Sequence, residues 1–191
     1  MNLLVLGPQG AGKGTQAKRI AAEYDLSHIS TGDRFRTEIA AGTEFGKRVQ
    51  SILAAGELVP DELTTEKLRE WLLAEGVGGF VLDGYPRNLT QAETLDELLK
   101  ALGKELDAIL FFDLPDDVAT ERLLKRAVEE NRPDDTPEVI ARRLAIYHDE
   151  TEPIVEHYRA TGKLVPLHAA RSVDKVYDEI QRALEQVGAA A

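Results

Sequence analysis

The segment with the clearest chemical pattern is Gly7-Pro-Gln-Gly-Ala-Gly-Lys-Gly-Thr15, which follows an apolar run and opens a stretch with helical spacing. Its glycines let backbone N–H groups turn toward a phosphate, and the helix N-terminus adds a partial positive charge. Lys13 can then reach the outer phosphates. Gly14 stands where the general pattern has Ser or Thr, and Thr15 comes one position later. The segment predicts a phosphate-binding loop (P-loop) with this one departure.

A second group, Asp83-Gly-Tyr-Pro-Arg87, directly follows the apolar run 80–82. Ligands of open parallel sheets bind outside the carboxyl ends of the strands, so Asp83 is expected to face the same phosphates. A carboxylate there is useful with a divalent cation, which it can hold directly or through waters. An isolated Asp-Gly is more often a turn, so this pattern alone leaves both interpretations open.

Arginines outnumber lysines by 14 to 9, although the chain is acidic. Arg122 and Arg126 share a helical face, Arg132 lies in a short polar segment, and Arg142 and Arg143 follow that segment. For any one of them, a solvated helix face is the ordinary explanation. Several arginines around one polar segment favour a phosphate clamp, because guanidinium groups bind phosphate oxygens bidentately.

Apolar runs of strand length alternate with stretches of helical spacing along the chain. The expected strands are 3–6, 80–82, 108–112 and 164–167, with the short segment His28-Ile29-Ser30 as a fifth. Continuous apolar strands between helices are typical of a parallel sheet that is covered on both faces. The sequence therefore predicts an α/β fold, a doubly wound parallel five-stranded sheet with helices on both faces.

Helix boundaries are indicated by capping residues and by one proline. Asp61, Thr90, Asp116 and Thr136 are the expected N-caps. Pro153 lies inside a long helical stretch, so we expect it to kink or split that helix.

Two segments do not follow the alternation of strands and helices. Residues 31–60 carry two helical patterns with no strand between them, and residues 129–136 are polar without apolar period. We interpret the first as an inserted helical subdomain, about 30–59, and the second as a short lid, about 126–136. An ordinary surface connection is the alternative for the lid. The chain 1–191 is expected to be one domain with these two appendages.

Composition excludes several classes of protein. The net charge of −11 over 191 residues argues against nucleic-acid binding, which depends on a basic surface. The absence of cysteine removes disulfides, thiolate zinc sites and thiol nucleophiles. The four histidines lack metal-ligand spacing and are expected to be structural or exposed. No apolar run approaches the ~18 residues of a membrane span, so a cytoplasmic protein without membrane contact is expected.

Several segments together resemble the adenylate kinases, in order and over nearly the whole chain. They are the loop Gly7 to Thr15, Ser30-Thr-Gly-Asp-Arg-Phe-Arg36, Gly56-Glu-Leu-Val59, Asp83 to Arg87 with Gln91, Arg122 with Arg126, and Asn131-Arg-Pro-Asp-Asp135 followed by Arg142-Arg143-Leu144. The Gly-Lys-Gly-Thr ending of the loop, which departs from the general pattern, is typical of this family.

The resemblance implies a nucleotide site for each substrate, with Arg122, Arg126 and Lys13 at the ATP phosphates. The residues implied for ATP are Gly10, Ala11, Gly12, Lys13, Gly14, Thr15, Arg122, Arg126 and Arg171. Those implied for AMP are Thr31, Arg36, Glu57, Leu58, Val59, Gly84, Tyr85, Pro86, Arg87, Gln91, Arg132 and Arg143. The catalytic set would be Lys13, Arg87, Arg122, Arg126, Arg132 and Arg143, and Asp83 and Asp33 would hold Mg²⁺ through waters.

The implied reaction is reversible phosphoryl transfer from MgATP to AMP, giving two ADP. The AMP phosphate is already an oxyanion, so alignment, charge neutralisation and exclusion of water are the work required. Adenylate kinases are an established case of lid closure, which excludes water. The lid of this chain is short and carries no cysteine, so no structural zinc is expected. The resemblance also implies a monomer.

Three alternatives are weighed against this interpretation. A UMP/CMP kinase shares the loop and arginines, and Asn88 is a feature of that branch, whereas Gln91 and Thr31-Gly-Asp33 favour adenine. A GTP-dependent switch is disfavoured because the chain has neither Asn-Lys-x-Asp nor Asp-x-x-Gly. A non-catalytic nucleotide-binding module would be expected to have lost Lys13 or the lid arginines, all of which are present.

Overall fold

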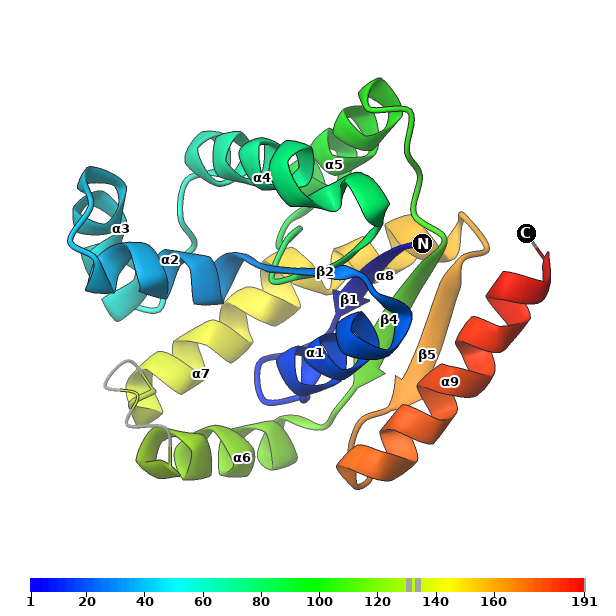
Figure 1. Cartoon of the computed structure of the whole chain (residues 1–191). Helices are drawn as coiled ribbons and strands as arrows, with labels where there is room; N and C mark the ends of the chain where they lie inside the picture. Colours follow the sequence, from blue (N-terminus) through cyan, green and yellow to red (C-terminus); the bar gives the residue numbers. More distant parts are fainter. Residues whose placement is uncertain (130–131, 133–134, 191) are drawn as a thin grey trace.

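The computed structural model describes residues 1–129, 132 and 135–190, with residues 189 and 190 described by their backbone alone. Across these residues five parallel strands form a sheet in the order β2-β3-β1-β4-β5 (Figure 1). The strands are β1 (Asn2–Leu6), β2 (Ser27–Ser30), β3 (Phe80–Asp83), β4 (Ala108–Asp113) and β5 (Leu164–His168). All five predicted strands are confirmed, and each is one residue longer than expected.

Helices cover both faces of the sheet. They are α1 (Lys13–Tyr24), α2 (Thr31–Ala40), α3 (Glu44–Ala54), α4 (Asp61–Glu75), α5 (Leu89–Ala101), α6 (Asp116–Glu129), α7 (Pro137–Ile146), α8 (Pro153–Arg159) and α9 (Val173–Ala190). Leu3 and Val5 of β1 pack with α1, α6 and α9, whereas Leu4 and Leu6 pack with α4, α5 and α8. Successive side chains of β1 therefore point into opposite cores. Both faces of the sheet are covered by helices, which confirms the doubly wound prediction.

The register of the strands brings the chemical segments to one edge. Val5 of β1 pairs with Asp83 of β3, which in turn pairs with Ser30 of β2. The carboxyl ends of parallel strands meet at the same side of a sheet, so the loop that begins at Gly7 emerges beside Asp83.

Of the four predicted helix caps, one is confirmed. Thr136 caps α7 through its side chain. The helix that was expected to start at Thr90 starts earlier, because the Asn88 side chain accepts a hydrogen bond from a backbone N–H and caps α5. Asp61 and Asp116 are the first residues of α4 and α6 rather than caps, so their carboxylates are available to other partners.

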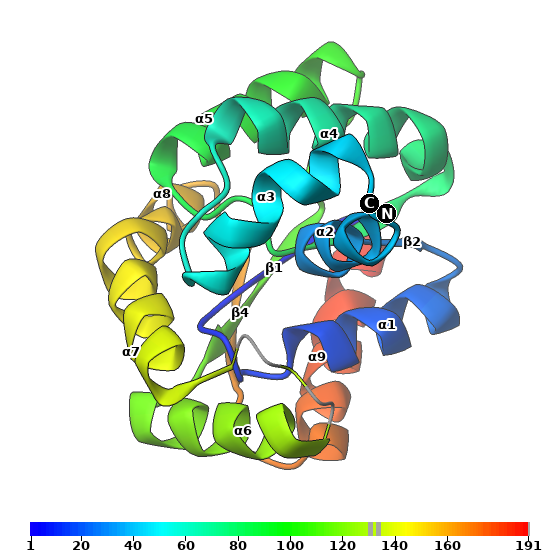
Figure 2. The same cartoon turned by 90° about the vertical axis from the view of Figure 1, so that its left-hand side faces the viewer.

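Of the two segments that do not follow the alternation, the first contains the two predicted helices. Residues 31–54, all of which the structure describes, form α2 and α3 joined by a short turn, and Thr43 caps α3. Both views place α6 below α2 and α3 (Figures 1 and 2). Four residues of the expected lid, 130, 131, 133 and 134, lie outside the described residues.

The long helical stretch is split near Pro153, as predicted. A π-helical turn, Tyr147–Thr151, separates α7 from α8, and Pro153 is the first residue of α8. Among the described residues we find no helix with the length and apolar character that crossing a membrane would need.

His148, in the π-helical turn, joins two carboxylates from different elements. Its Nε2 lies 2.9 Å from an oxygen of Asp116 at the start of α6, and its Nδ1 lies 2.8 Å from Glu152. Hydrogen bonds with Glu152 and then Asp116 raise the pKa of His148 above its ordinary value of 6.5. The protonated imidazole therefore stabilises the folded state.

This arrangement gives a pH-dependent contribution to stability. Because the folded-state pKa is raised, the contribution is complete below the unfolded-state pKa near 6.5 and is lost as the pH rises through the folded-state pKa. We expect His148→Gln to lower Tm at pH 6 and to have little effect at pH 9. Thermal unfolding from pH 5.5 to 9 measures this. An equal loss of Tm at both pH values would contradict the assignment.

Candidate active site

A cavity of about 790 Å³ lies at the carboxyl ends of β1 and β3. Its walls come from the loop after β1, from α2 and α3 on one side and from α6 and α7 on the other (Figure 2). The predicted site residues that line it are Gly10, Gly12, Lys13, Gly14, Thr15, Asp33, Arg36, Glu57, Asp83, Gly84, Pro86, Arg87, Arg122, Arg126, Arg132 and Arg143. The fold thus brings the P-loop, the acid after β3 and the arginines into one space, of a size that suits small ligands.

The side chain of Lys13 folds back onto the P-loop. Gly12 has a φ of 83°, a left-handed conformation that glycine adopts at little cost, and α1 starts directly after it. The Lys13 ammonium donates hydrogen bonds of 2.7 Å to the carbonyl oxygens of Gly7 and Pro8. These carbonyl oxygens therefore accept hydrogen bonds from N–H groups of Lys13 that a bound phosphate would also attract.

Burial and neighbouring charges lower the proton affinity of this lysine. Burial in the loop lowers the pKa of Lys13 to about 8, and the positive charges of Arg87 and Arg126 add to that effect. The negative charge of Asp83 opposes it. Burial also lowers the pKa of Arg87 from its ordinary value. Nearby negative groups only partly balance the positive charges of Lys13 and Arg87. An anion that enters the cavity would balance them further.

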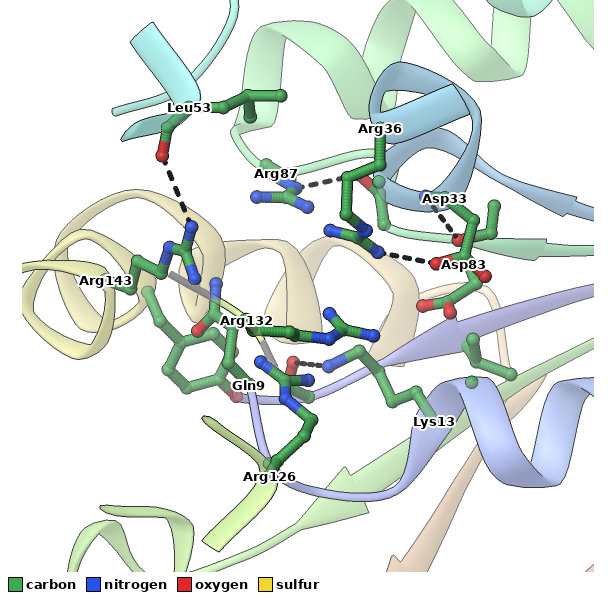
Figure 3. Close-up of a pocket in the computed structure, with 18 of the residues that line it drawn as sticks. Gln9, Lys13, Asp33, Arg36, Leu53, Asp83, Arg87, Arg126, Arg132 and Arg143 are labelled. Carbon is green, nitrogen blue, oxygen red and sulfur yellow. Dashed lines mark hydrogen bonds and ion pairs between the residues drawn. The ribbon is translucent and has the colours of Figure 1, made fainter. Parts of the chain in front are cut away.

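Asp83 and Asp33 are the two predicted metal-binding carboxylates, and both line the cavity (Figure 3). Asp83 is buried, and a Cβ at position 14 would lie 3.4 Å from its carboxylate, so Gly14 keeps the space beside that oxygen open. Asp33 binds Arg36 at 2.5 Å. Mg²⁺ is commonly held by one or two carboxylates together with waters and substrate phosphates. The two aspartates fit that donor set.

Gly84 links the end of β3 to the start of α2. The Thr31 hydroxyl and the Arg87 Nε both donate hydrogen bonds of 2.8 Å to its carbonyl oxygen. Its φ is 82°, and a Cβ there would lie 2.6 Å from the Thr31 hydroxyl oxygen. Only glycine fits, and the contacts hold the Arg87 guanidinium in the cavity wall.

Seven predicted site residues are described by the structure but do not line this cavity. They are Ala11, Thr31, Leu58, Val59, Tyr85, Gln91 and Arg171. Thr31, Tyr85 and Gln91 are buried, with side chains bonded to protein groups. The Arg171 carbonyl oxygen accepts a 3.5 Å hydrogen bond from Arg122.

Some lining residues were not anticipated from the sequence. They include Gln9, Lys18, Gln50, Leu53, Tyr147 and Thr151. Tyr147 follows Arg143 by four positions, a helical spacing that could have indicated a shared face. The Thr151 hydroxyl donates a 2.6 Å hydrogen bond to the Arg87 carbonyl oxygen, across 64 positions of sequence, and no local pattern indicates that contact.

Asp135 joins two of the lid arginines, a role that the sequence analysis did not assign. Its fully buried carboxylate accepts hydrogen bonds of 2.9 and 2.7 Å from Arg126 and one of 2.7 Å from Arg143. Arg143 also donates to the carbonyl oxygen of Leu53 at 3.3 Å (Figure 3). The carboxylate thus holds α6 and α7 together at the cavity wall.

The buried ion pairs of Asp135 give a prediction for stability. Removing one partner of a buried ion pair leaves the other charge uncompensated, which costs about 3 kcal/mol or more. We expect Asp135→Ala to lower the free energy of unfolding by about this amount, measured by urea denaturation. Asp149→Ala, which removes an exposed carboxylate, is the control and should change it by less than about 0.5 kcal/mol. A loss below about 1 kcal/mol for Asp135→Ala would mean that solvent satisfies both arginines.

Comparison with known proteins agrees with the geometry of the cavity. The family model described as Adenylate kinase matches residues 5–163. The chain is 43% identical over 186 residues to an adenylate kinase of Stenotrophomonas maltophilia (strain K279a), covering 97% of this chain and 100% of that protein. It is 44% identical over 190 residues to an adenylate kinase of Caulobacter vibrioides (strain NA1000 / CB15N), covering 99% and 100%. With a matching family model over most of its length and relatives of this identity, the chain belongs to the adenylate kinase family of phosphotransferases.

Proposed function

We propose that this enzyme transfers the terminal phosphoryl group of MgATP to AMP, giving two ADP, and that it also catalyses the reverse reaction. One observation carries the proposal: Lys13 of the P-loop and Arg36 and Arg87 on the opposite side line the same cavity. Two sets of phosphate-binding cations in one space suit a donor and an acceptor that both carry phosphate.

In the proposed arrangement, the P-loop N–H groups and Lys13 bind the ATP phosphates, with Arg122 beside them. Arg36 and Arg87 bind the AMP phosphate. An AMP phosphate oxygen attacks the γ-phosphorus, the bond from that phosphorus to the bridging oxygen breaks, and its electron pair stays on the β-phosphate of the departing ADP. No side chain has to remove a proton, so the residues act by alignment and charge neutralisation.

Asp83 and Asp33 would hold Mg²⁺ through waters beside the donor phosphates. When bound there, the ion would supply positive charge to the oxygens of the β- and γ-phosphates. The open space beside Asp83 that Gly14 leaves supports this assignment.

Arg126, Arg132 and Arg143 are proposed to close on the transferring group as one clamp. All three line the cavity, and Asp135 binds two of them. Phosphate oxygens can compete with the carboxylate for these guanidinium groups, so nucleotide binding would favour the closed lid by its differential affinity. The appendages 30–59 and 126–136 are in this view the AMP-binding subdomain and the lid.

The choice of adenine over a pyrimidine base is part of the proposal. Asn88, the feature that favours a UMP/CMP kinase, caps α5 and binds the carboxylate of Asp61. These contacts account for Asn88 without a base contact, so Asn88 does not favour a pyrimidine, and the adenine interpretation rests on Gln91. The proposal further includes a cytoplasmic monomer that acts on free nucleotides.

A coupled assay with MgATP and each of AMP, CMP, UMP and GMP tests the acceptor. We expect AMP to be preferred by a wide margin, and Gln91→Leu to raise KM for AMP about tenfold or more, since a site that hydrogen-bonds the base leaves a partner unpaired when the contact is lost. The exposed Gln186→Leu is the control and should leave KM unchanged. Equal or better turnover of CMP or UMP by the wild type would overturn the proposed substrate.

Lys13 is expected to neutralise phosphate charge more effectively in the transition state than in the ground state. Lys13→Ala should therefore lower kcat by at least about 100-fold, the typical loss of one preorganised donor. Its circular dichroism spectrum should match the wild type. Lys47→Ala, which removes an exposed lysine of α3, is the control. A folded Lys13→Ala enzyme with near-normal kcat would show that the loop does not act on the phosphates.

A further inference from the structure

We propose that Asp61 determines which purine the acceptor site accepts, by fixing which way round the Gln91 carboxamide is held. The inference rests on the proposed function, because Gln91 has a base to recognise only if a nucleoside monophosphate is the acceptor. Asp61 would be a positioning residue, acting through Gln91.

The contacts of the Gln91 side chain allow one orientation of its amide. The Gln91 Nε2 donates a 2.7 Å hydrogen bond to the Asp61 carboxylate, and the Gln91 Oε1 accepts a 2.8 Å hydrogen bond from the Arg87 backbone N–H. A carboxylate only accepts and a backbone N–H only donates. Turning the amide over would therefore set oxygen against oxygen at one end and two N–H groups together at the other. Gln91 is only 2% exposed, so water cannot relieve that mismatch.

Asp61 is itself held by a neighbouring residue of fixed orientation. The Asn88 Nδ2 donates to both carboxylate oxygens of Asp61, at 3.0 and 3.2 Å. The Asn88 Oδ1 accepts from the Gln91 backbone N–H at 2.8 Å, which determines which end of that amide faces Asp61. The backbone N–H of Gln91 thus fixes the orientation of the Asn88 amide. Asn88 and Gln91 both donate to the Asp61 carboxylate, which orients the Gln91 amide.

The locked amide matches one class of purine. Gln91 does not line the cavity itself but hydrogen-bonds to Arg87, which does. After these two contacts it retains one N–H donor and one oxygen lone pair, which the base would meet on binding. The edge of adenine presents an acceptor at N1 and a donor at the N6 amine, to which the N–H and the oxygen of the amide are complementary. A 6-oxopurine, such as the base of IMP or GMP, presents a donor at N1 and an acceptor at O6. Binding an oxopurine would require the reversed amide, which Asp61 and the Arg87 N–H both oppose.

The substitution Asp61→Asn keeps the shape of the side chain and removes this restriction at one end. An asparagine can present either an oxygen or an NH₂ group to Gln91, so it accommodates both amide orientations. The carboxylate of Glu62, the next residue of the same first helical turn, is exposed. Glu62→Gln therefore controls for the loss of one negative charge near the helix N-terminus.

The experiment measures kcat and KM for AMP and for IMP, with MgATP as donor. We expect Asp61→Asn to lower the ratio of kcat/KM for AMP to that for IMP by about tenfold or more, mainly through KM, because a site's discrimination depends on its paired polar groups. Glu62→Gln should keep the wild-type ratio. In a Gln91→Leu background, Asp61→Asn should change the ratio by less than about twofold, since no amide remains to be oriented.

Thermal unfolding of each variant separates this role from a structural one. An unchanged ratio in a folded Asp61→Asn enzyme overturns the inference, and so does an equal change of the ratio with and without Gln91. If Asp61→Asn does not fold, Asp61→Ser carries the test, because a hydroxyl group both donates and accepts and so accommodates either orientation of the Gln91 amide. It should lower the ratio in the same direction, and an unchanged ratio overturns the inference. A wild type that prefers CMP or UMP to AMP overturns the proposed function instead.

Discussion

Cationic side chains from distant parts of the chain meet in one cavity, and each of them needs a partner when no phosphate is bound. Lys13 uses the carbonyl oxygens of its own loop, Arg36 uses Asp33, and Arg126 and Arg143 use Asp135. Leaving a buried charge without a partner is costly, so the oxygens around Lys13, Arg126 and Arg143 stabilise the folded chain. They are also the groups with which nucleotide phosphates would compete. The same contacts therefore stabilise the folded chain and set the strength with which a ligand must bind.

The sheet makes this concentration of charge possible. Parallel pairing places Val5, Ser30 and Asp83 in one row, so the segments that follow β1, β2 and β3 emerge together. The cores on the two faces, which receive alternate side chains of β1, keep that row rigid. The backbone at Gly84 then has to pass within contact distance of Thr31, a closeness that excludes any side chain there.

Most of the fold could be predicted because its signals are local. Continuous apolar runs indicated four of the five strands, and the P-loop pattern placed Lys13 at the start of α1. The predictions for Asp61, Thr90 and Asp116 were wrong because a helix start depends on individual hydrogen bonds, such as the one accepted by Asn88. The partners of Asp135 and Asp61 could not be predicted for a related reason. A carboxylate pairs with whatever donor the tertiary structure brings near, and hydrophobic periodicity carries no information about that choice.

The contact between α7 and the end of α3 has a consequence for how the two nucleotides influence each other. Arg143 reaches the Leu53 carbonyl, and Arg142 forms an ion pair with Glu57, so α7, which follows the lid, contacts the appendage 30–59. A ligand that draws Arg143 toward its phosphates would alter this contact with the appendage 30–59. The two binding equilibria are then linked, and linkage is reciprocal. Whatever factor the donor nucleotide applies to the affinity for the acceptor, the acceptor applies to the affinity for the donor.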